Sequence, residues 1–170
     1  GAACAVCEEA PETEEGRTAG PYILVEDVKK AMQDIAAFYR SGLSIPVIGI
    51  TGSVGKTSTK EFIAGVLEKR FRVLKTQGNF NNEIGVPLTL FRIREEHEAA
   101  VVEMGINHFG EMHRLSRMAA PDIVVMTNIG DCHLEALGSR EGILKAKSEI
   151  FDFMKEDGTV IINGDDDMLS

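Results

Sequence analysis

The stretch "VIGITGSVGKTST", residues 47–59, joins an apolar run to a glycine-rich turn that ends in lysine and threonine. Residues 47–51 predict a buried strand, and residues 56–69 predict a helix. Glycine lets backbone N–H groups approach phosphate oxygens closely, and the following helix points its positive end at them. The stretch therefore predicts a phosphate-binding loop, with a simple glycine turn as the alternative.

The spacing of this loop is unusual. The common P-loop reads G-x-x-x-x-G-K-[ST], whereas here Ile50 stands at the first glycine position, which leaves Gly-x-x-Gly-Lys-Thr. In such a loop Lys56 contacts the terminal phosphates, and the hydroxyl of Thr57 ligates Mg²⁺. The nucleotide-binding residues that we expect are Gly52, Ser53, Val54, Gly55, Lys56, Thr57 and Ser58, with Asn128 from a later strand end.

Strands and helices alternate along the chain from Pro46 onward. We expect strands at 47–51, 72–75, 99–103, 123–127 and 159–163, and helices at 56–69, 84–91, 110–118 and 140–155. Continuous apolar strands separated by helices are typical of a parallel sheet that is covered on both faces. The predicted fold class is therefore α/β, with a parallel sheet and helices on both faces.

Two other strand ends carry polar residues, at the edge where open parallel sheets bind ligands. Glu103 closes "AAVVEMG" and is placed to hold a metal on the phosphate side, with a surface salt bridge as the alternative. Asn128 and His133 follow the fourth strand in "TNIGDCHLE". A lone histidine is more often structural, but the position of this one also favours a ligand role.

Lys147 has an unusual place on the predicted helix 140–155. It shares one face with Ile143, Ile150 and Met154, whereas Lys145 points the opposite way. Either the Lys147 stem packs while its amine reaches solvent, or the amine is directed into a site where burial lowers its pKa and makes it modifiable. Helical geometry alone leaves both readings open.

The loop "KTQGNFNNEIGVP", residues 75–87, contains Asn79, Asn81 and Asn82 within a short space. A turn explains part of this pattern. Such a density of amide groups at the same sheet edge also suits binding of a polar substrate or a phosphate group. We therefore treat the three asparagines as candidate substrate-binding residues.

The residues before Pro46 follow another pattern. The segment 1–9 predicts a short apolar strand, residues 8–20 an acidic solvated loop, and residues 26–40 a helix that Gly42 ends. Val28, Met32, Ile35 and Tyr39 recur in that helix at helical spacing. Cys4 and Cys7 form a C-x-x-C without a second pair, so we interpret them as core or strand cysteines rather than metal or redox groups.

The composition is that of a globular protein with an excess of acidic groups. The 170 residues are 44% hydrophobic and 26% charged, with a net charge of −9, which argues against broad nucleic-acid binding. No apolar run approaches the roughly 20 residues that span a bilayer, and no signal peptide is visible. The three cysteines give no disulfide framework, which favours a cytoplasmic protein. We also expect a monomer that binds neither nucleic acid nor membrane. Both ends of the sequence suggest a piece of a larger protein.

Four segments together resemble the Mur ligase family: "TGSVGKTSTKEF", "GNFNNEIGVPLTL", "VVEMGINHFGE" and "TNIGDCHLEALGSREGILKAKSEIF". The short Gly-x-x-Gly-Lys-Thr loop is the form that this superfamily shares with folylpolyglutamate synthetases. The resemblance covers roughly residues 20–170. It implies that residues 1–44 are the tail of an N-terminal UDP-sugar-binding domain and that 45–170 are the first part of a P-loop NTPase-like central ATP-binding domain.

The resemblance also implies a reaction, namely ATP- and Mg²⁺-dependent amide ligation in peptidoglycan precursor synthesis. It is strongest to members that join D-alanyl-D-alanine to UDP-N-acetylmuramoyl-tripeptide through an acyl phosphate. Thr57 and Glu103 match the residues that hold one Mg²⁺, His133 matches a ligand of a second, and Lys147 matches a lysine that is N-carboxylated (carbamylated) and supports this second metal. The implied catalytic residues are Lys56, Lys147 and His133, and Asn79, Asn81 and Asn82 match a substrate-side loop.

Other functions remain as alternatives. A GTPase switch is disfavoured because its guanine motif N-K-x-D is missing, since "NIGD" at 128–131 lacks the lysine. Within the enzyme class, the alternative is a related Mur-type or folylpolyglutamate-type ligase that adds a single amino acid. A further alternative is that this chain alone is an ATP-binding module without ligase activity.

Overall fold

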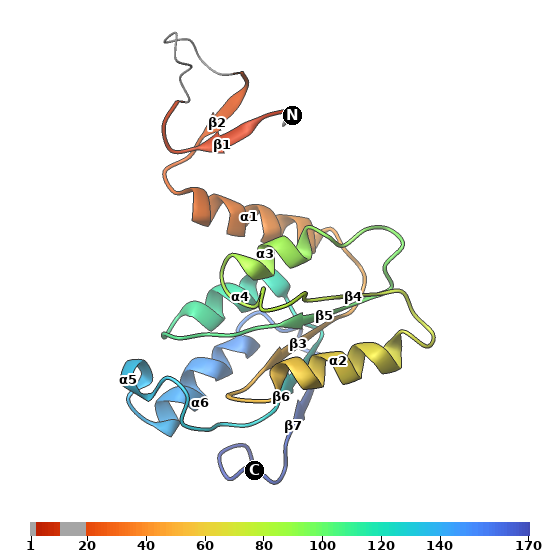
Figure 1. The fold of residues 1–170 in the computed structure, drawn as a ribbon, viewed down its shortest axis with the longest axis vertical. Helices are drawn as coiled ribbons and strands as arrows, with labels where there is room; N and C mark the ends of the chain where they lie inside the picture. Colours follow the sequence, from red (N-terminus) through yellow and green to blue (C-terminus); the bar gives the residue numbers. More distant parts are fainter. Residues whose placement is uncertain (1–2, 11–19) are drawn as a thin grey trace.

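The computed structural model describes residues 3–10 and 20–170, which form a small sheet and a larger α/β unit (Figure 1). The larger sheet has five strands in the order β4-β5-β3-β6-β7, and every neighbouring pair is parallel. Its strands are β3 (Val47–Thr51), β4 (Val73–Lys75), β5 (Ala99–Glu103), β6 (Ile123–Met126) and β7 (Thr159–Ile162). The predicted parallel α/β fold is confirmed.

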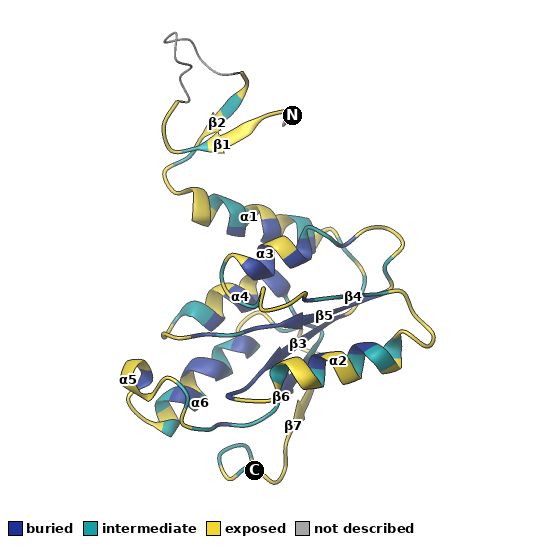
Figure 2. Cartoon of the chain, in the orientation of Figure 1, coloured by how far each residue is buried: buried dark blue, intermediate teal, exposed yellow. Residues whose placement is uncertain are grey.

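Helices cover both faces of this sheet. The helix α2 (Lys56–Leu67) packs on one face against the side chains of Ile48, Ile50 and Val101. The other face is covered by α1 (Val28–Ser41), α3 (Gly85–Leu90), α4 (Glu111–Ala119) and α6 (Arg140–Ser148). The strands β3 and β5 are buried along their whole length and appear dark blue in Figure 2, whereas β7 at the sheet edge is exposed.

The register of the strands brings three strand ends to one place. Ile50 of β3 lies beside Glu103 of β5, and Thr51 of β3 lies beside Met126 of β6. Because the strands are parallel, the segments that follow β3, β5 and β6 all leave the sheet at the same edge. The glycine loop, the residues after Glu103 and the segment around Asn128 therefore meet there.

The last helix is shorter than the sequence predicts. It was expected at 140–155, but α6 ends at Ser148 and continues as a short 3₁₀ turn, η1 (Glu149–Phe151). The carboxylate of Glu149 turns toward α4, where it accepts hydrogen bonds from the backbone N–H groups of Gly110 and His113. The Ser116 hydroxyl donates to the carbonyl of Ile150 at 2.7 Å. These contacts with α4 end the helix, so Met154 lies beyond it.

The residues before Pro46 contain an element that the sequence reading missed. A short strand β2 (Tyr22–Leu24) pairs in parallel with β1 (Ala5–Cys7), which confirms the strand predicted in segment 1–9 for its described part. The predicted loop 8–20 lies for the most part outside the described residues. Cys7 lies in β1, which confirms the interpretation of core or strand cysteines for this residue. Cys4 is exposed and lies just before the strand, so it is neither a core nor a strand residue.

The helix α1 begins after Asp27, whose side chain accepts a hydrogen bond from the Lys30 N–H at 2.8 Å. It buries Gln33, Ala36 and Arg40, whereas Ile35 of the recurring apolar set is 49% exposed. Pattern alone therefore predicted the helix but not its buried face. Another short helix, α5 (Leu134–Leu137), was not predicted.

Arg40 fastens α1 to the five-stranded unit. Its guanidinium is buried, donates to the carbonyls of Leu43, Ala119 and Ala120, and pairs with the Asp122 carboxylate at 2.9 Å. The carboxylate also accepts the Val47 N–H at the start of β3. The division near residue 44 into two domains stays a prediction, and α1 shares the core of the unit that follows it.

Within residues 3–10 and 20–170, no helix is both long enough and apolar enough to cross a membrane.

We expect Arg40→Met to lower the free energy of unfolding by about 3 kcal/mol, because it leaves Asp122 short of a partner and several buried carbonyls without a donor. Urea unfolding of the variant measures this change. Arg117→Met is the matched control: it removes an exposed pair with Asp34, for which we expect less than about 1 kcal/mol. Equal effects in the two variants would contradict the buried-anchor role.

Candidate functional site

The glycine loop leaves β3 in a conformation that only glycine fits at its first position. Gly52 has φ +144°, and a β-carbon added there would lie 2.0 Å from Thr127 Oγ1. Gly55 has φ +80° and directly precedes α2, whose N-terminus has no side-chain cap. An uncapped helix start beside closely approached backbone is the arrangement that binds phosphate groups in proteins.

Asn128 holds this loop in shape. Its side-chain oxygen accepts hydrogen bonds from the N–H groups of Ser53 at 3.1 Å and Val54 at 2.9 Å. The Ser53 hydroxyl in turn accepts from the Gly130 N–H at 2.9 Å. Ser53 is buried, whereas Val54 and Ser58 are exposed. The segment that follows β6 therefore supports the glycine loop through these hydrogen bonds. The side-chain oxygen of Asn128 is already bonded to the loop backbone.

Two lysine side chains converge on the carbonyl oxygen of Gly52. Lys56 Nζ donates to it at 2.8 Å, and Lys147 Nζ donates to it at 3.1 Å. Lys147 is 2% exposed, so its amine is directed into the site, whereas Lys145 on the same helix is exposed. The alternative in which the Lys147 amine reaches solvent was wrong.

The environment of Lys147 changes its acidity. Burial, with a smaller contribution from the nearby Lys56 ammonium, lowers the pKa of Lys147 from its usual 10.5 to about 8. At pH 7 about a tenth of the Lys147 side chains therefore carry a neutral amine, far more than for an exposed lysine. Such an amine is a far better nucleophile than the amine of an exposed lysine at the same pH.

Glu103 closes β5 with its carboxylate buried, at 2% exposure. One oxygen accepts a hydrogen bond from the Thr57 hydroxyl at 3.0 Å, and the other accepts from the Asn81 amide at 2.8 Å. The Thr76 hydroxyl lies 3.0 Å from the Glu103 backbone N–H and accepts from it. The surface salt bridge considered for this residue was therefore wrong.

A cavity of about 200 Å³ lies between these groups. It is lined by Lys56, Asn81, Asn82, Gly105, Ile106, Asn107, His133 and Lys147. The structure thus brings five of the candidate side chains to one hollow at the sheet edge, namely Lys56, Asn81, Asn82, His133 and Lys147. Thr57 and Glu103 are not among its lining residues. Asn79 does not line it; this residue is exposed, and its carbonyl accepts the Asn81 N–H within the turn.

His133 reaches this cavity from a left-handed backbone conformation, with φ +66°, just before α5. A residue other than glycine is held in this region only when its surroundings compensate the strain, and such positions cluster at functional sites. Partial desolvation of the ring, together with the charges of Lys147 and Lys56, lowers the pKa of His133. The imidazole is therefore mainly neutral near pH 7, as a metal ligand must be.

The donor set beside the glycine loop fits Mg²⁺. Thr57 and Glu103 supply a hydroxyl and a carboxylate whose oxygens are 3.0 Å apart. Mg²⁺ is usually held by one or two such oxygens, with phosphate and water completing the octahedron. No group of three or more His, Cys, Asp or Glu side chains suited to a metal occurs in the described part of the chain.

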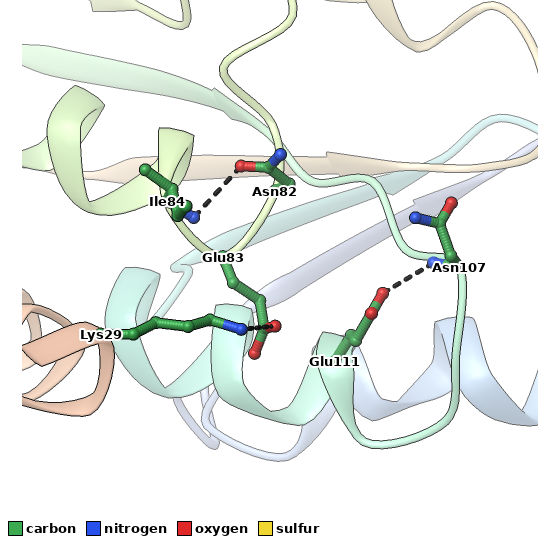
Figure 3. A pocket seen from close by; sticks show the side chains of 6 residues that line it. All are labelled: Lys29, Asn82, Glu83, Ile84, Asn107 and Glu111. Atoms are coloured by element: carbon green, nitrogen blue, oxygen red, sulfur yellow. Dashed lines mark hydrogen bonds and ion pairs between the residues drawn. The ribbon is translucent and has the colours of Figure 1, made fainter. Parts of the chain in front are cut away.

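A second hollow of about 200 Å³ shares Asn82 and Asn107 with the first and is shown in Figure 3. In Figure 3, Lys29 of α1 points toward Glu83. Glu83 also pairs with Arg114 of α4. Burial raises the pKa of Glu83, but hydrogen bonds from Arg114 and Lys29 outweigh it, so that the net pKa is lowered. This carboxylate therefore ties the asparagine loop to α1 and α4.

The sequence reading missed two residues of this region. Asn107 lines both hollows, and Lys60 lies beside Glu103 with its side chain 1% exposed. The position of Asn107, four residues beyond the strand end at Glu103, could have identified it. Lys60 gave no comparable signal, because a lysine within a helix usually faces solvent.

Comparisons with known proteins agree with this site. The family model "Mur ligase middle domain" matches residues 50–170. Over 147 residues the chain is 52% identical to the UDP-N-acetylmuramoyl-tripeptide–D-alanyl-D-alanine ligase of Bacillus subtilis, which covers 86% of this chain and 32% of that protein. The corresponding Escherichia coli ligase is 41% identical over 145 residues, covering 85% of this chain and 32% of that protein. The chain thus spans about a third of the length of these relatives.

Solved structures give the same result. MurF from Acinetobacter baumannii superposes with a TM-score of 0.89 at 36% identity, covering 98% of this chain and 36% of that one. MurF ligase from Thermotoga maritima, solved in complex with ADP, superposes with a TM-score of 0.85 at 33% identity over 97% of this chain and 38% of that one. The apo form of the L. casei protein named FPGS, at 18% identity and a TM-score of 0.62, shows only the same fold over 84% of this chain and 45% of that one.

We expect Lys147→Met to remove a pH dependence of stability. The folded-state pKa of about 8 lies below the usual 10.5, so the unfolded chain binds more protons between these values and stability rises with pH across that window. Burial of the charged amine lowers the free energy of unfolding by about 3 kcal/mol, and this loss is fully present below pH 8. Unfolding free energies at pH 7.5 and 10.5 measure this rise, which should be missing in Lys147→Met and retained in Lys145→Met. A rise that survives in Lys147→Met would contradict the assignment.

Proposed function

The chain belongs to the Mur ligase family by its middle domain, and on that premise we propose that it is the ATP-binding part of an amide ligase. The complete enzyme would join D-alanyl-D-alanine to UDP-N-acetylmuramoyl-tripeptide during peptidoglycan precursor synthesis, for cell wall biogenesis. The names of the Bacillus subtilis and Escherichia coli relatives support these substrates. The free cysteines fit a reducing compartment, so we assign the protein to the cytoplasm, as a monomer.

The observation that carries the proposal is the convergence of Lys56 and Lys147 on the Gly52 carbonyl, beside the buried carboxylate of Glu103. The Lys56 ammonium and the uncapped N-terminus of α2 produce a local positive field at this loop within a protein of net charge −9. A triphosphate is the ligand that such a loop accommodates, and the relative from Thermotoga maritima was solved with ADP.

In the proposed reaction, an oxygen of the tripeptide carboxylate attacks the terminal phosphorus of ATP, and the bond to the departing ADP breaks. The amine of D-alanyl-D-alanine then attacks the carbonyl carbon of the resulting acyl phosphate, loses a proton and expels phosphate, which leaves an amide. Lys56 would turn from the Gly52 carbonyl to the transferred phosphoryl group and stabilise its charge. Mg²⁺, held by Thr57 and Glu103, would supply further charge neutralisation.

The cavity side chains would orient the carboxylate substrate. Asn81 and Asn82 line the same hollow as Lys56, so they are the proposed substrate contacts. Asn79 would act from the exposed turn beside them. The backbone N–H groups of Gly55 and Ser58, at the uncapped start of α2, would face the phosphates. Ser53 and Val54 would border the phosphate site, while their own N–H groups stay bonded to Asn128, which keeps the loop in shape.

Lys147 is the proposed site of carbamylation. Its neutral amine would add to the carbon of CO₂ and release one proton, and the carboxylate so formed would support a second Mg²⁺ together with His133. The burial of the amine and its pKa of about 8 favour this addition. A related ligase that adds a single amino acid, or a chain that binds ATP without ligase activity, remain as the other candidates.

Lys56→Ala in the complete ligase should lower phosphate release by about 100-fold or more, because the phosphoryl group loses its main cation. The assay measures phosphate release with ATP, Mg²⁺, UDP-N-acetylmuramoyl-tripeptide and D-alanyl-D-alanine. Lys69→Ala, an exposed lysine just beyond α2, is the control and should keep its activity. Near-normal release by Lys56→Ala would refute the loop's role, and release with glutamate in place of D-alanyl-D-alanine would favour the other ligase class.

Lys147→Ala should be inactive and should regain part of its activity when short carboxylic acids such as formate or acetate are added. The added acid would occupy the space left by the side chain and replace the carbamate oxygens. Lys145→Ala should be active and insensitive to the acids. Full activity of Lys147→Ala without any acid would refute carbamylation as a requirement.

A further inference from the structure

Lys60 is a buried cation to which the proposed reaction assigns no part. It lies one helical turn beyond Lys56 on α2, its side chain is 1% exposed, and it does not line the cavity. Lysine is almost never buried so completely unless it is paired, because removing an ammonium group from water is costly. The reason for its burial must therefore lie in the groups that it contacts.

The ammonium of Lys60 lies between two carboxylates of different character. Its Nζ is 3.2 Å from Glu61 Oε1 and 3.8 Å from Glu103 Oε2. Glu61 is half exposed and has a second partner in Lys75 at 2.6 Å. Glu103 is buried, and its hydrogen-bond donors Thr57 and Asn81 are neutral groups. Glu103 therefore depends on Lys60 for a neighbouring positive charge, whereas Glu61 does not.

Thr57 and Lys60 reach the same oxygen of Glu103 from one side of α2. They are three residues apart, which places both on one face of the helix. The Thr57 hydroxyl donates its proton to Oε2, and its oxygen lone pairs stay available to a metal ion. Lys60 adds a positive charge beside the same oxygen, and this charge holds the carboxylate on the side of Thr57.

We propose that Lys60 is a positioning residue that holds the Glu103 carboxylate beside Thr57, so that the two Mg²⁺-binding oxygens are in place before the nucleotide arrives. This inference rests on the proposed function for the identity of the metal. Lys60 touches neither metal nor substrate and acts through Glu103. Residues that orient a metal-binding carboxylate in this way contribute to metal affinity without being ligands.

The first test measures ATP binding by calorimetry at graded Mg²⁺ concentrations in the complete protein. In Lys60→Met, the Mg²⁺ concentration for half-maximal ATP binding should rise by about 10-fold to 100-fold. Lys60→Arg keeps the charge and should retain most of the affinity. Lys75→Met removes a cation from the Glu61 network without reaching Glu103, so it should leave the Mg²⁺ dependence unchanged. An unchanged Mg²⁺ dependence in Lys60→Met would overturn the proposal.

The second test needs no metal or nucleotide. Unfolding free energies of Lys60→Met, Glu103→Gln and the double variant form a cycle that measures the coupling of the two side chains. Lys60→Met alone should destabilise the protein, and Glu103→Gln in the same chain should restore part of the loss. Additive effects would overturn the proposal. If Lys60→Met does not fold, the other two variants decide. Folding of the double variant supports the pairing of Lys60 with Glu103. Failure of both the double variant and Lys60→Arg to fold refutes it.

These outcomes separate the inference from the proposed function. If the unsubstituted protein binds ATP without any need for Mg²⁺, the metal role of Glu103 fails, whereas the unfolding cycle still decides whether Lys60 holds its carboxylate. If Mg²⁺-dependent binding is present and Lys60→Met leaves it intact, the proposed function stands and this inference fails.

Discussion

The candidate site depends on the pairing of β3 with two parallel neighbours, β5 and β6. The registers of Ile50 with Glu103 and of Thr51 with Met126 align the three strand ends. Because these hydrogen bonds are buried and satisfied along the whole of β3, the strand cannot slip without exposing unpaired backbone groups. The glycine loop, Glu103 and Asn128 are therefore held next to one another by the sheet, and no flexible segment has to bring them together.

Charge is arranged unevenly around this junction. The chain as a whole carries a net charge of −9, but Lys56 and Lys147 meet at the Gly52 carbonyl, and Lys60 lies beside the buried carboxylate of Glu103. An excess of cations in a partly desolvated place is costly in the free protein, and the lowered pKa of Lys147 is one sign of that cost. A polyanionic ligand would relieve it, so binding of a nucleotide and stabilisation of the site should go together.

The segment before Pro46 is tied to the same region by contacts of two kinds. Arg40 is buried against Asp122 at the start of the sheet, whereas Lys29 meets Glu83 at the rim of the hollow shared with Asn82 and Asn107. The first contact is desolvated and the second is half exposed, so removal of one partner destabilises the protein more at the first contact than at the second. α1 thus has a buried contact near its C-terminal end and a half-exposed contact with the asparagine loop near its N-terminal end.

The sequence by itself determined the alternation of strands and helices and the phosphate-binding loop, because both follow from local periodicity and turn chemistry. It placed Glu103 at the end of one strand and His133 beyond the end of another. It also placed Lys147 on an apolar helix face, but only packing decided that its amine is buried against Gly52. Tertiary structure alone decided that α6 stops at Ser148, that Asn128 supports the loop, and that Lys60 is buried beside Glu103. Each of these depends on partners 34 or more positions away in the chain, as with Ser116 and Ile150. Contacts of this kind form only when the sheet brings distant segments together, so a local pattern cannot record them.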